Sequence, residues 1–315
     1  MQKAPPRTVQ TDPPEWLSAL LGGDRAALAR AITAVENDTA EARAVLQAIR
    51  DKLGRAVVVG FTGAPGAGKS TLVSAYVRAL RERGQTVGVV AVDPSSPLTG
   101  GAILGDRIRM TQHAGDPGVF IRSLASRGHL GGLSRTATRV IDVFDAAGRD
   151  VIVVETVGTG QSEVEVAEIA DVRVVVNAPG LGDDIQAIKA GILEIADILV
   201  VNKSDLPFAE RSARQLAAMS AQRAQGPVPV LQTSATRNEG IAELADAIAA
   251  IGRRKRPDPR ARQRRLLHAL ALDRLRRALE SLPDVEADAL AEQVLSGQAD
   301  IETVLHDITS RLRKT

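Results

Sequence analysis

Short runs of β-branched and aliphatic residues alternate along this chain with longer stretches in which apolar residues recur every three or four positions. The short runs are typical of strands buried on both faces of a parallel sheet, and the longer stretches are typical of amphipathic helices. Together they predict an α/β fold with a mostly parallel central sheet flanked by helices. The expected strands cover residues 57–59, 86–92, 119–122, 150–155, 172–176, 198–201 and 228–232.

Helical patterns without strands occupy both ends of the chain. A polar, Pro-rich lead over residues 1–12 precedes a helical pattern from Trp16 to Ile49, and further helices are expected at 267–282, 287–295 and 301–312. We therefore expect an N-terminal helical extension (1–52) that braces the central domain, the α/β domain itself (53–252) and a C-terminal helical extension (253–315). The last helices bury too little core alone, so we expect them to dock in a homodimer. The basic stretch 253–265 is expected to be a solvated linker.

One stretch of the central domain matches a phosphate-binding motif. Residues 63–70 read Gly-Ala-Pro-Gly-Ala-Gly-Lys-Ser, which fits G-x-x-x-x-G-K-[ST], and they lie between a predicted strand and a predicted helix. Backbone N–H groups of such a loop surround phosphate oxygens at a helix N-terminus, so a P-loop NTPase is predicted. Lys69 is expected on the β- and γ-phosphates and the Ser70 hydroxyl on Mg²⁺. The expected nucleotide-binding residues of this loop are Gly63, Ala64, Pro65, Gly66, Ala67, Gly68, Lys69, Ser70 and Thr71.

A second motif follows the strand expected at 150–155. That strand ends in Glu155, and Gly158 stands three residues further on. An acidic residue that ends an apolar strand, followed by such a glycine, is typical of the metal-binding and γ-phosphate-sensing segment of P-loop proteins. Glu155 is therefore expected to reach Mg²⁺, usually through water, and the Gly158 N–H to meet the γ-phosphate.

A third motif indicates which base the site recognises. Asn202-Lys203-Ser204-Asp205 matches N-K-x-D, and its Asp carboxylate can accept hydrogen bonds from N1–H and the N2 amine of guanine. Adenine offers no such pair of donors, so GTP and GDP are predicted rather than ATP. The Lys203 stem is expected along the base and Asn202 as a brace. Ser234 and Ala235, after the last predicted strand, are expected to present backbone N–H to guanine O6.

Composition narrows the possible partners and compartment. Lys and Arg total 40 and Asp and Glu total 38, which gives a net charge of +2 and no electrostatic signature of a nucleic-acid or membrane partner. Aromatic residues make up 2%, too few for base-stacking platforms. The absence of cysteine excludes disulfides and thiolate metal sites. With no apolar leader and no long apolar run, a cytoplasmic protein is expected.

Several further blocks resemble the MeaB/ArgK family, G-protein chaperones of adenosylcobalamin-dependent acyl-CoA mutases. The blocks are Asp93-Pro-Ser-Ser, Gly100-Gly-Ala-Ile-Leu-Gly-Asp106, Glu155-Thr-Val-Gly-Thr-Gly-Gln-Ser-Glu163, Gly182-Asp-Asp-Ile-Gln-Ala-Ile-Lys-Ala-Gly191 and Asn202-Lys-Ser-Asp205. The resemblance implies a dimer-forming P-loop domain that gates cobalamin loading into, and rescue of damaged cofactor from, a partner mutase. It implies no tightly bound cobalamin in the chaperone itself. Methylmalonyl-CoA mutase is the default client, and other acyl-CoA mutases fit equally well.

The resemblance also assigns roles to single residues. It places Asp93, Asp106 and Glu155, with Ser70, in the acidic metal and switch shell. It places Gln186 and Lys189 in a third switch that answers to nucleotide and partner. Together with Lys69 and Glu155, these two complete the expected catalytic set.

The sequence favours a switch over a fast hydrolase. No glutamine immediately follows Gly158, so the attacking water lacks an evident orienting residue, and we expect slow hydrolysis that a partner accelerates. Two alternative functions would use the same predicted domain, namely a metallochaperone GTPase and a P-loop kinase. A nickel-type metallochaperone would need a Cys/His metal site, and this chain has no cysteine and four scattered histidines. A P-loop kinase would need an acceptor base such as Asp93. A non-enzymatic scaffold would tolerate loss of Lys69.

Overall fold

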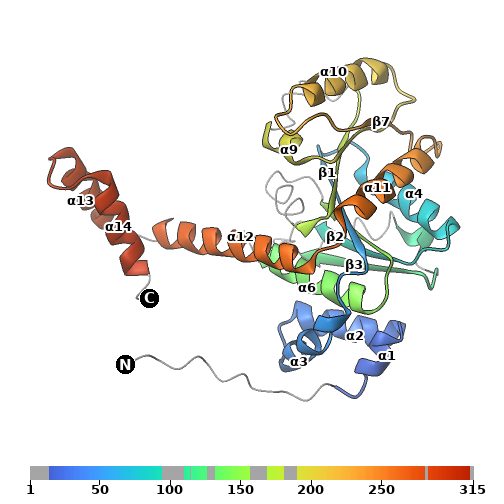
Figure 1. Cartoon of the computed structure of the whole chain (residues 1–315), viewed down its shortest axis with the longest axis horizontal. Helices are drawn as coiled ribbons and strands as arrows, with labels where there is room; N and C mark the ends of the chain where they lie inside the picture. Colours follow the sequence, from blue (N-terminus) through green and yellow to red (C-terminus); the bar gives the residue numbers. More distant parts are fainter. Residues whose placement is uncertain are drawn as a thin grey trace. The chain divides into compact units, whose positions relative to one another are not determined.

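The computed structural model describes residues 14–93, 110–113, 115–125, 132–156, 169–180, 190–280 and 283–312. It divides into two compact units, Met1–Leu266 and Leu267–Thr315. The division falls after Leu266, whereas the sequence analysis begins the C-terminal extension at residue 253. The first unit holds the sheet and every motif of the sequence analysis (Figure 1).

The first unit is built on a seven-stranded sheet in the order β3-β2-β4-β1-β5-β6-β7, and every neighbouring pair is parallel. This confirms the predicted α/β class and places each strand close to an expected apolar run. The strands are β1 (Val57–Gly63), β2 (Val87–Asp93), β3 (Val119–Ala125), β4 (Val151–Thr156), β5 (Val172–Asn177), β6 (Ile198–Val201) and β7 (Val230–Gln232). Since β4 and β5 both pair with β1, the strand that leads into the P-loop lies at the centre of the sheet.

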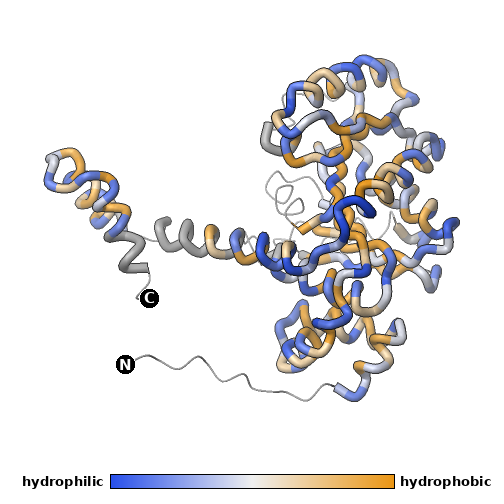
Figure 2. Tube along the Cα trace, viewed as in Figure 1, coloured by the Kyte–Doolittle hydropathy of each residue, from blue (hydrophilic) through white to orange (hydrophobic). Residues whose placement is uncertain are grey.

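Helices cover both faces of the sheet, and alternate residues of each strand point into the two layers. Val58 packs in one buried cluster with helices α1 (Leu17–Leu21), α2 (Arg25–Glu36), α3 (Ala40–Ala48) and α6 (Gly132–Ala146). Val59 packs in the other with α4 (Lys69–Glu82) and α11 (Ile241–Lys255). Figure 2 shows the hydrophobic residues running through the middle of this unit along the strands. The N-terminal helices therefore brace the sheet, as expected from their apolar faces.

The remaining helices complete the edges of the unit. Helices α9 (Ala190–Ile195) and α10 (Ala209–Ala221) pack against β6 around Leu199 and Leu216. Short 3₁₀ turns η1 (Arg50–Lys52) and η2 (Thr111–His113) precede β1 and β3. In the part of the chain that the structure describes, no helix is both long and apolar enough to cross a membrane.

Charged side chains form hydrogen bonds and ion pairs at the amino-terminal ends of the strands. The Asp145 carboxylate accepts hydrogen bonds from three successive backbone N–H groups, those of residues 54–56, at 2.6–3.0 Å. Asp171 accepts from Val58 N at 3.0 Å and from Arg262 Nη2 at 3.3 Å. Arg262 is fully buried, with Asp142 as its second carboxylate partner at 3.6 Å. This edge of the sheet is therefore held by ion pairs as well as by apolar packing.

The burial of Arg262 corrects one expectation. Most of the basic stretch 253–265 is exposed and leads into α12 (Pro259–Glu280), as expected, but Arg262 is buried, and α11 continues to Lys255, so only residues 256–258 link the two helices. Lys255 donates to Asp197 Oδ1 at 2.6 Å, so a second cation of this stretch also has a carboxylate partner in the sheet domain. The sequence shows the run of positive charges but not the distant carboxylates that neutralise them.

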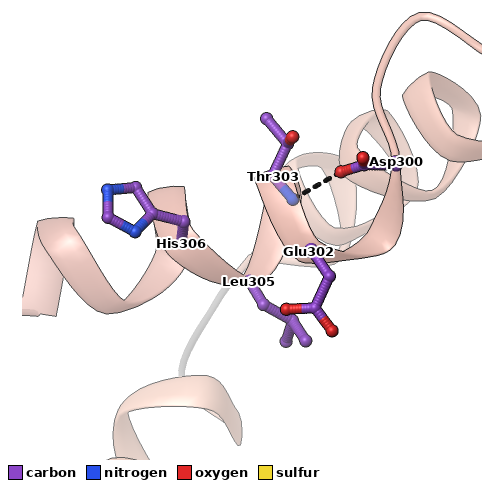
Figure 3. Close-up of a pocket in the computed structure, with 5 residues that line it drawn as sticks. All are labelled: Asp300, Glu302, Thr303, Leu305 and His306. Carbon is purple, nitrogen blue, oxygen red and sulfur yellow. Dashed lines mark hydrogen bonds between the residues drawn. The ribbon is translucent and has the colours of Figure 1, made fainter.

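The second unit contains the end of α12 together with α13 (Asp284–Leu295) and α14 (Ile301–Leu312). Asp300 caps α14, since its carboxylate accepts a hydrogen bond from the backbone N–H of Thr303 at 2.7 Å (Figure 3). Leu305 and His306 follow on the same helix and line the same pocket as Asp300 and Thr303 (Figure 3). Large apolar side chains are exposed on these helices, namely Leu267, Leu272, Val285, Leu295, Ile301 and Leu305.

Candidate nucleotide-binding site

The loop between β1 and α4 has a shape that only glycine allows at two positions. Gly63 has φ +139°, and a Cβ there would lie 2.0 Å from the carbonyl oxygen of Val176 on β5. Gly68 has φ +84° and ends the loop as the N-cap of α4, where a Cβ would lie 2.6 Å from Asn202 Nδ2. Because these neighbours are backbone or buried amide groups, a side chain at either position would displace the loop.

Lys69 and Ser70 open α4 and are both buried. Lys69 Nζ donates to the carbonyl oxygens of Gly63 at 2.7 Å and Ala64 at 3.0 Å, so its stem lies across the loop. Ser70 Oγ donates to Glu155 Oε1 at 2.5 Å. The helix N-terminus, the ammonium and the hydroxyl thus meet at the carboxyl edge of the sheet, where open α/β sheets bind ligands.

Glu155 reaches Ser70 because β4 lies next to β1, with Glu155 in register with Phe61. Its carboxylate is 1% exposed. A serine hydroxyl and a carboxylate are hard oxygen ligands, and Mg²⁺ is usually held by one or two such protein groups plus phosphate oxygens and water. The donor set therefore fits Mg²⁺ at this point. No cluster of three or more His, Cys, Asp or Glu that could hold a metal occurs among the described residues.

Asn202 joins the predicted base-reading loop to the P-loop. Its Nδ2 donates to the carbonyl oxygen of Ala67 at 3.0 Å, while its Oδ1 accepts from Thr233 Oγ1 at 3.1 Å and Ala235 N at 3.3 Å. The side chain is almost fully buried. The neighbouring Lys203 donates from Nζ to the carbonyl oxygen of Gly66 at 2.7 Å. The three loops that the sequence analysis assigned to one nucleotide are thus bonded to one another.

Asp205 is held as an oriented carboxylate. Ser234 Oγ donates to its Oδ1 at 2.7 Å, and this hydrogen bond, with a smaller attraction from Arg237, holds the pKa of the carboxyl below its usual range. The group is therefore negative at neutral pH and accepts hydrogen bonds, which is what recognition of N1–H and N2 of guanine requires.

Several predicted residues lie outside the described part of the chain. These are Asp106, Gly158, Gln186 and Lys189. Asp93 is described as the last residue of β2, in register with Ala125 of β3, which places it at the same edge of the sheet as Glu155. Thr71 is exposed in the first turn of α4, and the remaining loop residues lie between β1 and α4 as expected.

Three features of the site were not anticipated from the sequence. Thr233 orients Asn202 from a fully buried position. His113, also buried, lies with Nε2 3.0 Å from Ser74 Oγ, so it joins η2 to α4 one turn after Ser70. Burial lowers the His113 pKa, which favours the neutral ring. The Thr62 and Thr156 hydroxyls are buried at the ends of β1 and β4 with no hydrogen-bond partner among the described residues. His113, Thr156 and Thr233 each stand beside another polar residue in the sequence, so no interrupted apolar run marks them.

Known proteins resemble this chain over most of its length. The family model described as methylmalonyl-CoA mutase-associated GTPase MeaB matches residues 28–282. A protein of Pyrococcus abyssi is 51% identical over 240 residues, which are 74% of this chain and 74% of that protein. GTPase ArgK of Escherichia coli is 47% identical over 195 residues, 61% of this chain and 59% of ArgK.

A solved structure extends the likeness to three dimensions. The crystal structure of a LAO/AO transport system kinase superposes with a TM-score of 0.73 at 28% sequence identity. The alignment covers 95% of this chain and 97% of that one. The arrangement of sheet, P-loop and helices described above is therefore shared with that protein.

Proposed function

This chain belongs to the family of methylmalonyl-CoA mutase-associated GTPases, and we propose that it is a slow GTPase that gates cobalamin loading and rescue of an adenosylcobalamin-dependent acyl-CoA mutase. The observation that carries the nucleotide part of this proposal is the bonding of Asn202 to both the P-loop and the loop of Thr233 and Ala235. A guanine base read by Asp205 is thereby fixed relative to its own phosphates. The family match supports the mutase as partner.

Different residues of the site recognise the phosphates, the metal ion and the base of the nucleotide. Backbone N–H groups at the start of α4 and the Lys69 ammonium bind the β- and γ-phosphates, and Asp205 reads the base. Ser70 and Glu155 would hold Mg²⁺, which supplies positive charge against the charge that develops on the phosphates during transfer. Lys69 gives up its carbonyl contacts to Gly63 and Ala64 when it turns to the phosphates.

Partner stimulation is the second part of the proposal. We assign the water-orienting and switching roles to the segments that hold Asp106, Gly158, Gln186 and Lys189, with Asp93 at the root of the first. Docking of the mutase completes these segments around the γ-phosphate and raises the hydrolysis rate. Without the partner, turnover is expected to stay below about 1 per second, the low end of ordinary enzymes.

The test is GTP hydrolysis by the full chain alone and with each of several adenosylcobalamin-dependent acyl-CoA mutases. Stimulation by one mutase is expected, and the same preparation should then control cobalamin transfer to that mutase in a nucleotide-dependent way. Lys69→Ala should lose hydrolysis by about a hundredfold or more, since it removes a charge that stabilises the transferring phosphoryl group. Failure of every mutase to stimulate, with tight GTP binding retained, would refute the chaperone role but not the nucleotide site.

We also propose that the second unit mediates a homodimer. Its helices expose large apolar side chains such as Val285, Leu295 and Ile301, and packing against a second copy would remove their surface from water. Light scattering at micromolar concentration should give twice the chain mass. Val285→Asp with Leu295→Asp should give the monomer, and a monomer mass for the unaltered chain would contradict the proposal.

A kinase activity is the second candidate, because the superposable solved structure is described as a transport system kinase. The two candidates differ in the acceptor of the γ-phosphate. With γ-labelled GTP, the GTPase proposal predicts that label passes only to water. Label on a protein or small molecule in the presence of the mutase would favour the kinase.

A further inference from the structure

A second cavity lies at the edge of the sheet opposite the nucleotide site. It has a volume of about 340 Å³ and lies where α4 and α11 pack together over the amino-terminal ends of β1 and β4. All of its lining residues belong to the first unit. Its size falls at the lower end of the range for small-molecule sites. The nucleotide motifs lie at the carboxyl ends of the same strands, so this cavity is separate from them.

The mouth of the cavity is positively charged. Arg55, Arg253 and Arg256 line it, and within the described part of the chain none of these guanidinium groups forms an ion pair or a side-chain hydrogen bond. Asp150 also lines the mouth, but its Oδ2 already accepts hydrogen bonds from Thr86 N at 2.7 Å and Thr86 Oγ1 at 2.8 Å. Three arginines therefore face one carboxylate that is engaged elsewhere. Arginine presents several donors in a planar fork, which suits carboxylate and phosphate groups.

The rest of the lining is mostly apolar, with Tyr76 and Gln85 as its uncharged polar side chains. Leu80 and Ile248 supply aliphatic surface, and the ring of Tyr76 is tilted by 49° against that of Phe61, with 5.5 Å between the ring centroids. Tyr76 is 1% exposed, yet its hydroxyl makes no hydrogen bond to any described residue. Burial raises the pKa of this hydroxyl, so it keeps its proton and can donate. Tyr76 lines the cavity and its hydroxyl is not among the fully buried unpartnered atoms, so the donor is open to water or a ligand there.

We propose that this cavity binds a small amphipathic anion, with its apolar body against Leu80 and Ile248 and its carboxylate or phosphate head at the three arginines. The Tyr76 hydroxyl donates a further hydrogen bond to the ligand. This site goes beyond the proposed GTPase function and does not depend on it. A purely structural role for these cations, as favourable charges at the carboxyl end of α11, needs no ligand and is the alternative that the experiment separates.

The experiment uses the full chain labelled with ¹³C-tyrosine. Tyr76 is the only tyrosine in the sequence, so its ring gives a single reporter signal. The probes are hexanoate and hexyl phosphate, with hexanol to remove the charge and inorganic phosphate to remove the apolar body. Saturable shifts with a Kd of about 1 mM or tighter are expected for one or both amphipathic anions. Binding at least about tenfold weaker is expected for hexanol and for inorganic phosphate.

Two variants test the two halves of the site. Arg55→Gln with Arg253→Gln should weaken binding of the anion about tenfold or more. The matched control, Arg260→Gln with Arg264→Gln, removes the same charge from exposed positions outside the cavity and should leave binding unchanged. Ala249→Phe should block the body of the ligand with all cations in place. Binding of a fluorescent GDP confirms that each variant is folded.

Three results would overturn the proposal. The first is no shift of the Tyr76 signal with either amphipathic anion. The second is equal weakening by the control pair, which would reduce the effect to net charge. The third is binding of inorganic phosphate as tight as that of hexyl phosphate, which would leave no role for the apolar floor. Because GDP binding is measured in parallel, loss of the nucleotide site is recognised independently.

Discussion

The nucleotide site and the cluster around Arg262 both bury charged side chains in the first unit, and they balance that charge in different ways. At the nucleotide site, Lys69 is held by backbone carbonyls and Glu155 by the Ser70 hydroxyl. Nucleotide phosphates and a cation would be further partners of these two groups. Arg262 instead lies 3.6 Å from Asp142 and 3.3 Å from Asp171, so its counter-charges belong to the chain itself.

This difference predicts which substitutions affect ligand binding and which affect the stability of the fold. The charged groups of a binding site also act on a ligand, so a substitution there should change binding more than folding. A closed cluster needs its buried cation, because removal of that cation leaves the carboxylates around it buried and unpaired. The predictions below test this division, beginning with the largest expected effect.

Arg262→Ala should lower the free energy of unfolding of the first unit by about 3 to 5 kcal/mol, because Asp142 and Asp171 stay buried without their cation. Denaturant unfolding followed by circular dichroism measures this change, and GDP affinity should be unaltered where the protein is folded. Arg260→Ala is the control, since Arg260 is exposed in the first turn of α12. A loss no greater than that of the control would show that the cluster does not stabilise the fold.

Asp205→Asn should weaken GTP binding by about a hundredfold, because two hydrogen bonds from guanine lose their charged acceptor. XTP should bind the variant better than GTP does, since the new amide can donate to its C2 carbonyl. Competition against a fluorescent nucleotide gives both affinities. Asp246→Asn, which removes an exposed carboxylate on α11, should change neither. Unaltered preference for GTP in the Asp205 variant would remove the assigned role of this carboxylate.

The stability contributed by the Arg262 cluster should depend on pH through Asp142. Burial raises the pKa of Asp142 to about 7, against the attraction of Arg262. The native state thus holds a proton that the unfolded state releases near its ordinary pKa of 3.8. The free energy of unfolding should therefore fall as pH rises from about 4 to about 7, and then level off.

Asp142→Asn removes this titration and tests the sign. The variant and the unaltered chain should be similar in stability at about pH 4, where the folded carboxyl is protonated and the unfolded one has only begun to ionise. At about pH 8 the variant should be more stable by on the order of 4 kcal/mol. Thermal unfolding at several pH values measures the gap, with Asp246→Asn as an exposed control. A gap that stays constant over this range would contradict the raised pKa.

Asp300→Ala should give the smallest effect, because this carboxylate is exposed and only caps α14. Loss of the helix cap should quicken amide hydrogen exchange in α14 about fivefold. The hydrogen bond from Thr303 lowers the Asp300 pKa, and the cap should therefore weaken only in acid. Asp288→Ala inside α13 is the control. Equal exchange rates in the two variants would show that the cap does not stabilise the helix.

Much of the fold was predictable because the strands are buried on both faces. Valine-rich runs such as 172–176 have that appearance whatever lies beside them. Strand ends were less predictable. The expected strand at 57–59 continues to Gly63, since Gly60 pairs with both β4 and β5 despite the weak strand preference of glycine. Pairing with two neighbours outweighs local preference at the centre of a sheet.

The candidate site was predictable where its residues are contiguous in sequence, and not where they meet only in the fold. Lys69, Ser70 and Asp205 stand in motifs that fix their chemistry. The bond from Ser234 to Asp205 and the packing of His113 on Ser74 join segments that no short motif spans. The burial of Arg262 could not be predicted for the same reason, because its partners Asp142 and Asp171 lie 120 and 91 residues away in the sequence.

The bonds from Asn202 and Lys203 to the P-loop have a consequence for nucleotide exchange. Asn202 is bonded to Ala67 and Lys203 to Gly66, so the base pocket and the phosphate cradle share a mechanical connection. A movement of either loop is therefore expected to disturb the other. We expect GDP to leave in one step with a single rate constant. A factor that opens either loop should therefore set the lifetime of the complex between this protein and GDP.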